Sequence, residues 1–355
     1  SIKLKLLNLL QIKVFLMNFD KYYVFNIKQK QGVLNMNKYT KIGLTALAGS
    51  LVAGSVSAAE MSASGSAGMT FTGGDEKSNH GNGWTMADSV TFSASGDVND
   101  IGVTLSLELD GDAADGTNQL DSQSITFDLG DAGTLVFAGH GGSSAMSAVD
   151  DVMPTAYEEP WDVVTGADAD IINGATAENS WNYTYNHDSG LLLNLHYVNA
   201  SDAGVDVSYS DFAVEYTGVE GLRIGYAAGE VEAVTGTKTD EHTMFATYAI
   251  EGLTLGVQLS ENDRSANSTA DTESTGFGAS YQVSDELTVS IGTHEIEYNS
   301  GDDQEATGVG VSYTMGSMTL GGVINSIDNQ GPGATGNTDT NADTYAVSYT
   351  HLRAH

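Results

Sequence analysis

Apolar and polar residues alternate along most of this 355-residue chain after residue 60, in short stretches that end in turn-forming residues. In residues 101–110 the odd positions are Ile, Val or Leu, whereas the even positions are Gly, Thr, Ser or an acid. Residues 253–260 and 308–315 show a closely similar pattern. Alternation with a period of two predicts β-strands that have one apolar and one polar face, and we count roughly sixteen of them.

The connections between these strands alternate in length. The tight ones begin at Asp128, Asn186, Thr217, Ala249, Val283 and Thr314, and the long ones begin at Gly73, Gly111, Glu232, Glu261 and Asn329. An antiparallel up-and-down barrel has this arrangement, with tight turns on one rim and long loops on the other. Greek-key sandwiches instead mix connections of varied length. The sequence therefore predicts an all-β fold, a 16-stranded antiparallel transmembrane barrel in one domain, although a soluble sandwich shares the alternation.

Both ends of the chain differ from the stretch between them. Residues 36–58 combine a basic start at Met36, an apolar run over residues 42–54 and small residues before Ala58, which is the pattern of a secretory signal peptide. Residues 1–35 precede this signal and differ in composition, so we interpret them as translated upstream sequence. Residues 347–355 resemble a translated sequencing adapter that replaces the native C-terminus. The predicted barrel comprises residues 59–346.

Composition narrows the class of function. The chain has no Cys, which excludes disulfides and thiolate metal sites. The formal charge is −34, and after residue 58 there are 5 basic residues against 46 acidic ones. Such a surface repels nucleic acid and anionic solutes and concentrates cations. The sequences G-x-S-x-G, H-E-x-x-H and the phosphate-binding loop are all missing, so we do not expect an enzyme.

One connection, residues 139–178, is much longer than the others, and a structureless loop of this length is usually functional. It carries apolar residues such as Met146, Met153 and Trp161, which we expect to pack against other parts of the chain. It has no Lys or Arg, and its acids include Asp150, Asp151, Glu158, Glu159, Asp162, Asp168 and Asp170. Hard cations prefer several carboxylate oxygens, so Asp168 and Asp170 are candidates for a weak Ca²⁺ or Mg²⁺ site.

The order of strand, tight Gly/Asp turn, strand and Gly-rich run in SITFDLGDAGTLVFAGHGG, followed by the long acidic loop, is similar to Gram-negative general-diffusion porins. The alphaproteobacterial type is the most similar, and the resemblance covers about residues 60–346, including an opening strand like AEMSASGSAGMTFTG. In that family the third long loop folds into the barrel and constricts the pore, and three barrels form a trimer. The resemblance implies an outer-membrane homotrimer, exported through the periplasm and surrounded by outer-membrane lipid.

The resemblance also implies a set of residues at the pore constriction. Carried over, the acids at this constriction are Asp150, Asp151, Glu158, Glu159 and Asp162. Such porins set an Arg/Lys cluster opposite, and here the chain departs from the pattern. Arg223 has the polar parity of its strand and should face the lumen, together with His140 and His196, whereas Lys77, Lys238 and Arg264 are expected in long outer loops. Acids without basic partners favour cations.

These observations predict passive diffusion of small hydrophilic solutes and ions, with cations preferred. No cofactor is expected apart from a structural Ca²⁺ or Mg²⁺, and no nucleic acid partner is expected. Two alternatives stay open at this point. One is a structural or adhesive outer-membrane barrel whose pore is closed. The other is a secreted acidic β-sandwich that binds calcium or glycans. Apart from these two, the loop acids could be a solvated charge run instead of pore residues.

Overall fold

The computed structural model describes residues 60–74, 83–111, 120–162, 171–172, 178–199, 207–233, 238–264, 271–329 and 342–354. These residues form sixteen β-strands and one short 3₁₀ turn, Gly130–Ala132. The strands are β1 Glu60–Gly74, β2 Trp84–Val98, β3 Ile101–Asp110, β4 Leu120–Asp128, β5 Thr134–His140, β6 Ser180–His187, β7 Leu191–Val198, β8 Val207–Val219, β9 Leu222–Ala233, β10 Lys238–Ile250, β11 Leu253–Arg264, β12 Thr272–Gln282, β13 Leu287–Tyr298, β14 Gln304–Met315, β15 Met318–Asp328 and β16 Ala342–Ala354. No helix in these ranges is long and apolar enough to cross a membrane.

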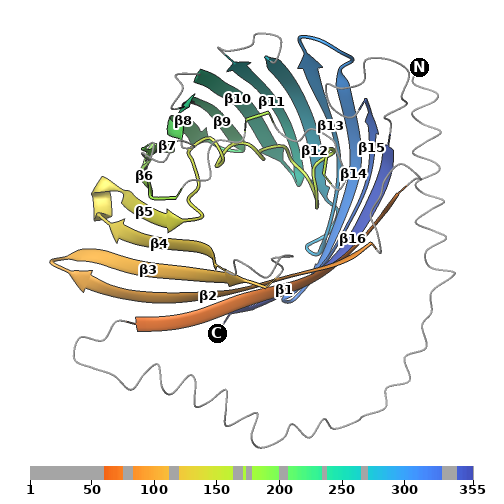
Figure 1. The fold of residues 1–355 in the computed structure, drawn as a ribbon. Coiled ribbons are helices and arrows are strands. Elements are labelled where there is room, and N and C mark those ends of the chain that lie inside the picture. Colours follow the sequence, from red (N-terminus) through yellow and green to blue (C-terminus); the bar gives the residue numbers. More distant parts are fainter. Residues whose placement is uncertain are drawn as a thin grey trace, which may run out of the picture. The chain divides into compact units, whose positions relative to one another are not determined.

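The sixteen strands close into one antiparallel barrel, in which each strand pairs with its neighbours in the sequence (Figure 1). The barrel closes between β1 and β16, whose register runs from Ser64 opposite Ala354 to Gly74 opposite Thr344. Closure leaves no unpaired strand edge, which is the condition for a sheet to stand in lipid. The predicted 16-stranded barrel is confirmed, and the sandwich interpretation is wrong.

The apolar parity of the strands faces outward. Met86, Leu105, Ile291 and Ile324 are exposed by 61%, 45%, 54% and 58%, and many other large apolar side chains share this outer face. A soluble protein rarely exposes an apolar surface of this extent, whereas a barrel in a bilayer presents it to the acyl chains. The polar parity faces the lumen. The barrel therefore places its hydrophilic surface inside, where it can form a water-filled passage.

The tight turns gather at one rim, as the alternating connections predict. Gly221, between β8 and β9, shows why small residues are needed there. Its φ is +75°, and a Cβ at this position would lie 2.3 Å from the carbonyl oxygen of Ala249. Glycine is the residue that adopts this conformation without strain.

Two basic residues are placed differently from the prediction. Lys238 begins β10 and Arg264 ends β11, although both were expected in outer loops. This difference arises because the alternation of apolar residues ends with the lipid-facing part of a strand, whereas the hydrogen bonds between strands continue beyond it. Residues 347–354 lie within β16, where all of them pair with β1 and residues 347–351 also pair with β15. The origin of this tail stays a prediction, as do the assignments of residues 1–35 and 36–58, which lie outside the described residues.

Candidate pore constriction

The long connection between β5 and β6 folds into the barrel, and Figure 1 shows its yellow-green trace along the inner side of the strands that follow β8. Trp161 of the loop packs against Ala306 and Ile327 of the wall. Other apolar loop residues pack against the wall in a larger buried cluster. The cluster comprises Ala145, Met146, Val149, Val152, Met153 and Ile172 of the loop with Ala213, Ala227 and Phe245 of the wall. The predicted packing of the apolar loop residues is confirmed. We name the inner face of β8–β15 the covered wall and that of β1–β5 the open wall.

Side chains of the covered wall hold the loop backbone by hydrogen bonds. Gln258 Nε2 donates to the Val149 carbonyl at 2.9 Å, and the Ala156 amide donates to Ser290 Oγ at 2.8 Å. Asn325 Nδ2 donates to the carbonyls of both Glu159 and Asp162, at 2.9 and 2.7 Å. Asn325 is fully buried. Because buried backbone groups without partners are costly, these bonds fix the path of the loop across the wall.

Glycines clear the space that the loop occupies. A Cβ at Gly321 would lie 2.3 Å from the Tyr157 ring, and one at Gly256 would lie 2.4 Å from Pro154 Cδ. Gly278, Gly292 and Gly308 make similarly close approaches to Pro154 or Pro160. We name these five residues, Gly256, Gly278, Gly292, Gly308 and Gly321, the glycine trough. A cavity of about 10 Å³, lined by Glu158 and Glu159 among others, is left between trough and loop, which is about the space of one water molecule.

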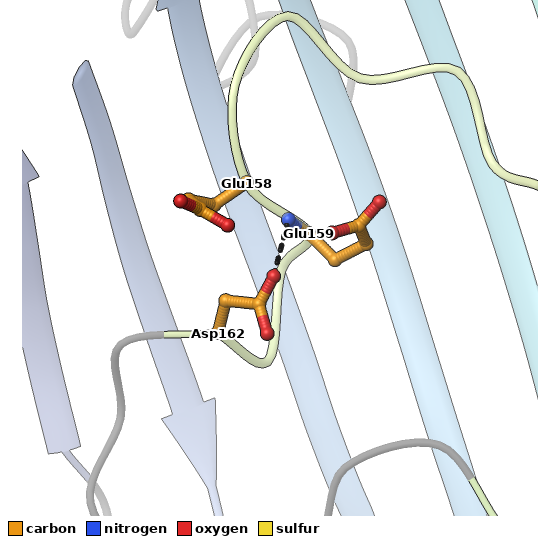
Figure 2. A group of neighbouring side chains, drawn as sticks. All are labelled: Glu158, Glu159 and Asp162. Carbon is orange, nitrogen blue, oxygen red and sulfur yellow. Dashed lines mark hydrogen bonds between the residues drawn. The ribbon is translucent and has the colours of Figure 1, made fainter. Parts of the chain in front are cut away.

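Three loop acids form a tight group, the acid cluster of Glu158, Glu159 and Asp162, shown in Figure 2. One carboxylate oxygen of each lies within 4.8 Å of the others, and the Glu159 amide donates to Asp162 Oδ2 at 2.9 Å. Partial burial and then the neighbouring carboxylates raise the pKa of Glu158 to about 7 and that of Glu159 to about 9. An arrangement of this kind attracts cations, because a nearby positive charge relieves the repulsion, and it offers the oxygen ligands that Ca²⁺ or Mg²⁺ prefers.

A second pair of acids lies earlier in the loop. The Asp151 amide donates to Asp150 Oδ1 at 2.9 Å. Desolvation, with a smaller contribution from the charge of Asp151, raises the pKa of Asp150 to about 6, and desolvation also raises the pKa of Asp151. The structure thus brings together the predicted acids of the loop. Asp168 and Asp170 lie outside the described residues, as does Lys77.

The other predicted residues lie in different places. Arg223 is on the lumen side, where its Nε lies 2.6 Å from Glu215 Oε2 and its guanidinium stacks on Phe245. His140 Nδ1 lies 3.2 Å from Glu178 Oε1 near the start of the loop. His196 differs from the prediction, because its side chain is fully buried against Asp211 and does not reach the lumen. Asp211 in turn accepts a hydrogen bond from the Met146 amide, so this pair anchors the loop.

The open wall has a different composition, which the pattern of charged residues in the sequence does not reveal. Its inward positions are mostly Ser and Thr, and the described part of β1–β5 contains no Lys or Arg. Thr70 Oγ1 donates to Ser348 Oγ at 3.0 Å, and both hydroxyls bond the Tyr157 side chain of the loop. Glu158 follows Tyr157 directly, so the acid cluster lies beside the edge of the open wall. Period-two Ser/Thr in residues 62–95 and 104–126 is the sequence signal for this surface.

Comparisons with known proteins agree with this geometry. A sequence model described as Gram-negative porin matches residues 43–304 and 205–352. No curated protein matches the chain. The structure is similar to an anion-selective porin from Comamonas acidovorans, with 17% identity and a TM-score of 0.64 over 83% of this chain and 100% of that one. It is also similar to OmpT, an outer membrane protein of Vibrio cholerae, with 15% identity and a TM-score of 0.63 over 85% and 99% of the two chains.

Proposed function

The chain belongs to the Gram-negative porin family and is an outer-membrane protein, and we propose that it forms a passive channel for small hydrophilic solutes that prefers cations. One observation carries the preference for cations. The loop that narrows the lumen presents Asp150, Asp151 and the acid cluster, while the described part of the open wall contains no Lys or Arg. A lumen lined by acids lowers the energy of cations and raises that of anions. The similar porin from Comamonas acidovorans is anion-selective, so the fold alone does not decide whether a channel of this kind prefers cations or anions.

The test neutralises the loop acids together in planar bilayers. We expect the permeability ratio of K⁺ over Cl⁻ to fall roughly twofold to fivefold in the variant Asp150→Asn, Asp151→Asn, Glu158→Gln, Glu159→Gln. The ratio is measured from reversal potentials in a KCl gradient. The matched control neutralises the same number of acidic groups in the exposed short turns, at Asp131, Asp188, Glu220 and Glu251. This control should leave the ratio almost unchanged. An unchanged reversal potential in the loop variant would reject the assignment, and a protein without conductance would favour the structural barrel.

We also propose that three barrels assemble into a trimer. OmpT of Vibrio cholerae has been solved in a trimer form, and its structure is similar to this one, with 14% identity and a TM-score of 0.62 over 83% of this chain and 100% of that chain. The mass of the detergent-solubilised protein, measured by light scattering, tests the assembly.

Ca²⁺ or Mg²⁺ that enters the lumen would be held most closely by the acid cluster. A Ca²⁺ titration that leaves the K⁺ current unchanged would contradict that placement.

A further inference from the structure

The open wall carries an ordered array of hydroxyl groups. Ser62 pairs with Ser93, Ser93 with Ser106, and Ser106 with Ser124, so these serines lie side by side across β1–β4. Residues that are directly opposite in neighbouring strands have Cβ atoms only about 4.5–5.5 Å apart. The adjoining rows are of the same kind, and we name the whole set the hydroxyl lattice: Ser62, Ser64, Thr91, Ser93, Ser95, Thr104, Ser106, Ser122, Ser124 and Thr126. None of these residues is buried.

Acids border the hydroxyl lattice at both of its ends. Glu108 and Asp110 share the inner face of β3 near the long-loop rim, and Asp97 and Asp128 flank Gly102 near the short-turn rim. A cation that moves along the open wall therefore meets negative charge at entry and at exit, with neutral hydroxyls between. The described residues of this wall include no Lys or Arg that would attract an anion. The wall has hydrogen-bonding capacity without a positive charge.

The hydroxyl lattice and the acid cluster line the same passage. Tyr157 bonds to Thr70 and Ser348 at the edge of the open wall, and the next residue is Glu158 of the cluster. A solute that crosses the lumen therefore passes carboxylates on the loop and hydroxyls on the open wall. Carboxylates accept strong, charge-assisted bonds from ammonium groups, and Ser/Thr hydroxyls both donate to and accept from the hydroxyls of a solute.

We propose that the favoured solutes are small organic cations that also carry several hydroxyl groups, the chemical class of amino sugars and amino alcohols. The ammonium group passes along the loop acids while the hydroxyls exchange water for the lattice. No aromatic side chain belongs to the lattice, so each contact is weak, and weak contacts at several sites let a solute leave as readily as it enters. This inference rests on the proposed channel function and refines it by naming the solute class.

The test compares solutes of similar size in proteoliposome permeation assays with the full-length protein. Glucosamine carries both charge and hydroxyls, cyclohexylammonium carries only the charge, glucose carries only hydroxyls, and gluconate is an anion. We expect glucosamine to permeate roughly threefold faster than cyclohexylammonium and faster than glucose, with gluconate slowest. In Ser93→Ala, Ser106→Ala, Ser124→Ala the advantage over cyclohexylammonium should disappear. In Glu158→Gln, Glu159→Gln the advantage over glucose should disappear instead.

A conservative variant separates lost chemistry from lost structure. Ser93→Thr, Ser106→Thr, Ser124→Thr keeps the hydroxyls and suits a strand, so it should retain the glucosamine advantage. Heat-modifiable migration on a gel checks that each variant folds. Equal rates for glucosamine and cyclohexylammonium in the unmodified protein would overturn this inference while leaving the cation preference in place. If the unmodified protein showed no preference for K⁺ over Cl⁻, that result would instead count against the proposed function.

Discussion

The two halves of the barrel look alike from outside and differ inside. Both present aliphatic and aromatic side chains to lipid. On the inside, the covered wall holds glycines and buried polar residues such as Asp211, Gln258 and Asn325, whereas the open wall holds half-exposed Ser and Thr. The reason is what each wall meets. A wall that packs against a loop needs close approach and hydrogen-bond partners for backbone groups, and a wall that meets water needs only solvated polar groups.

The largest effect is expected when a glycine of the covered wall is replaced by a bulkier residue. In Gly321→Val the new side chain would overlap the Tyr157 ring, and overpacking of this kind costs about 1–3 kcal/mol. We expect the loop to leave its position, so cleavage after Glu158 by a Glu-specific protease should accelerate roughly tenfold or more. The fragment masses identify the cut site.

The neighbouring residue supplies the control for this experiment. Gly322 points to the outer face, where a Cβ would lie 3.5 Å from Val311 Cγ1, an ordinary contact. Gly322→Val should therefore leave cleavage and conductance close to those of the unmodified protein. Equal protease resistance in the two variants would show that the glycine trough does not hold the loop.

A smaller effect is expected from adding charge to the open wall. Ser106→Arg with Ser124→Arg places two positive charges side by side on adjacent strands of the open wall, where the described residues include no Lys or Arg. We expect the permeability ratio of K⁺ over Cl⁻ to fall roughly twofold. Ser106→Gln with Ser124→Gln has similar bulk without charge and should change the conductance more than the ratio. An equal change of ratio in both variants would mean that size, not field, decides selectivity.

Sequence patterns were sufficient to predict the barrel, because apolar and polar residues alternate with a period of two wherever one face of a strand meets lipid. They were insufficient for the covered wall. Gly256 and Gly321 occupy inward positions like any other small residue, and what they contact depends on a loop far away in the chain. Asn325 bonds Glu159 across 166 residues, and no local pattern encodes that pairing.

The same limit explains the histidine and the strand ends. His196 has the inward parity of a pore-lining residue, and only the path of the loop shows that it is buried. Lys238 precedes the first apolar residue of β10 and Arg264 follows the last one of β11, where alternation gives no signal although the strand pairing continues. The acids of the loop could be predicted because a run of acidic residues without Lys or Arg can be recognised from the sequence alone. The distances between these acids could not be predicted, because they depend on how the loop folds.

The smallest expected effect is a pH dependence that belongs to the loop and not to the open wall. Burial and neighbouring carboxylates raise the pKa of Asp150 to about 6 and that of Glu158 to about 7, so both lose protons as the pH rises from 5 to 8. Cation preference should grow over this range, by less than about twofold. Because the docked loop favours the protonated acids, its stability is highest below their ordinary pKa values and declines as the pH passes 6 to 7. The variant with all four loop acids neutralised should show a much flatter profile, and a preference that falls with rising pH would contradict the role of these acids.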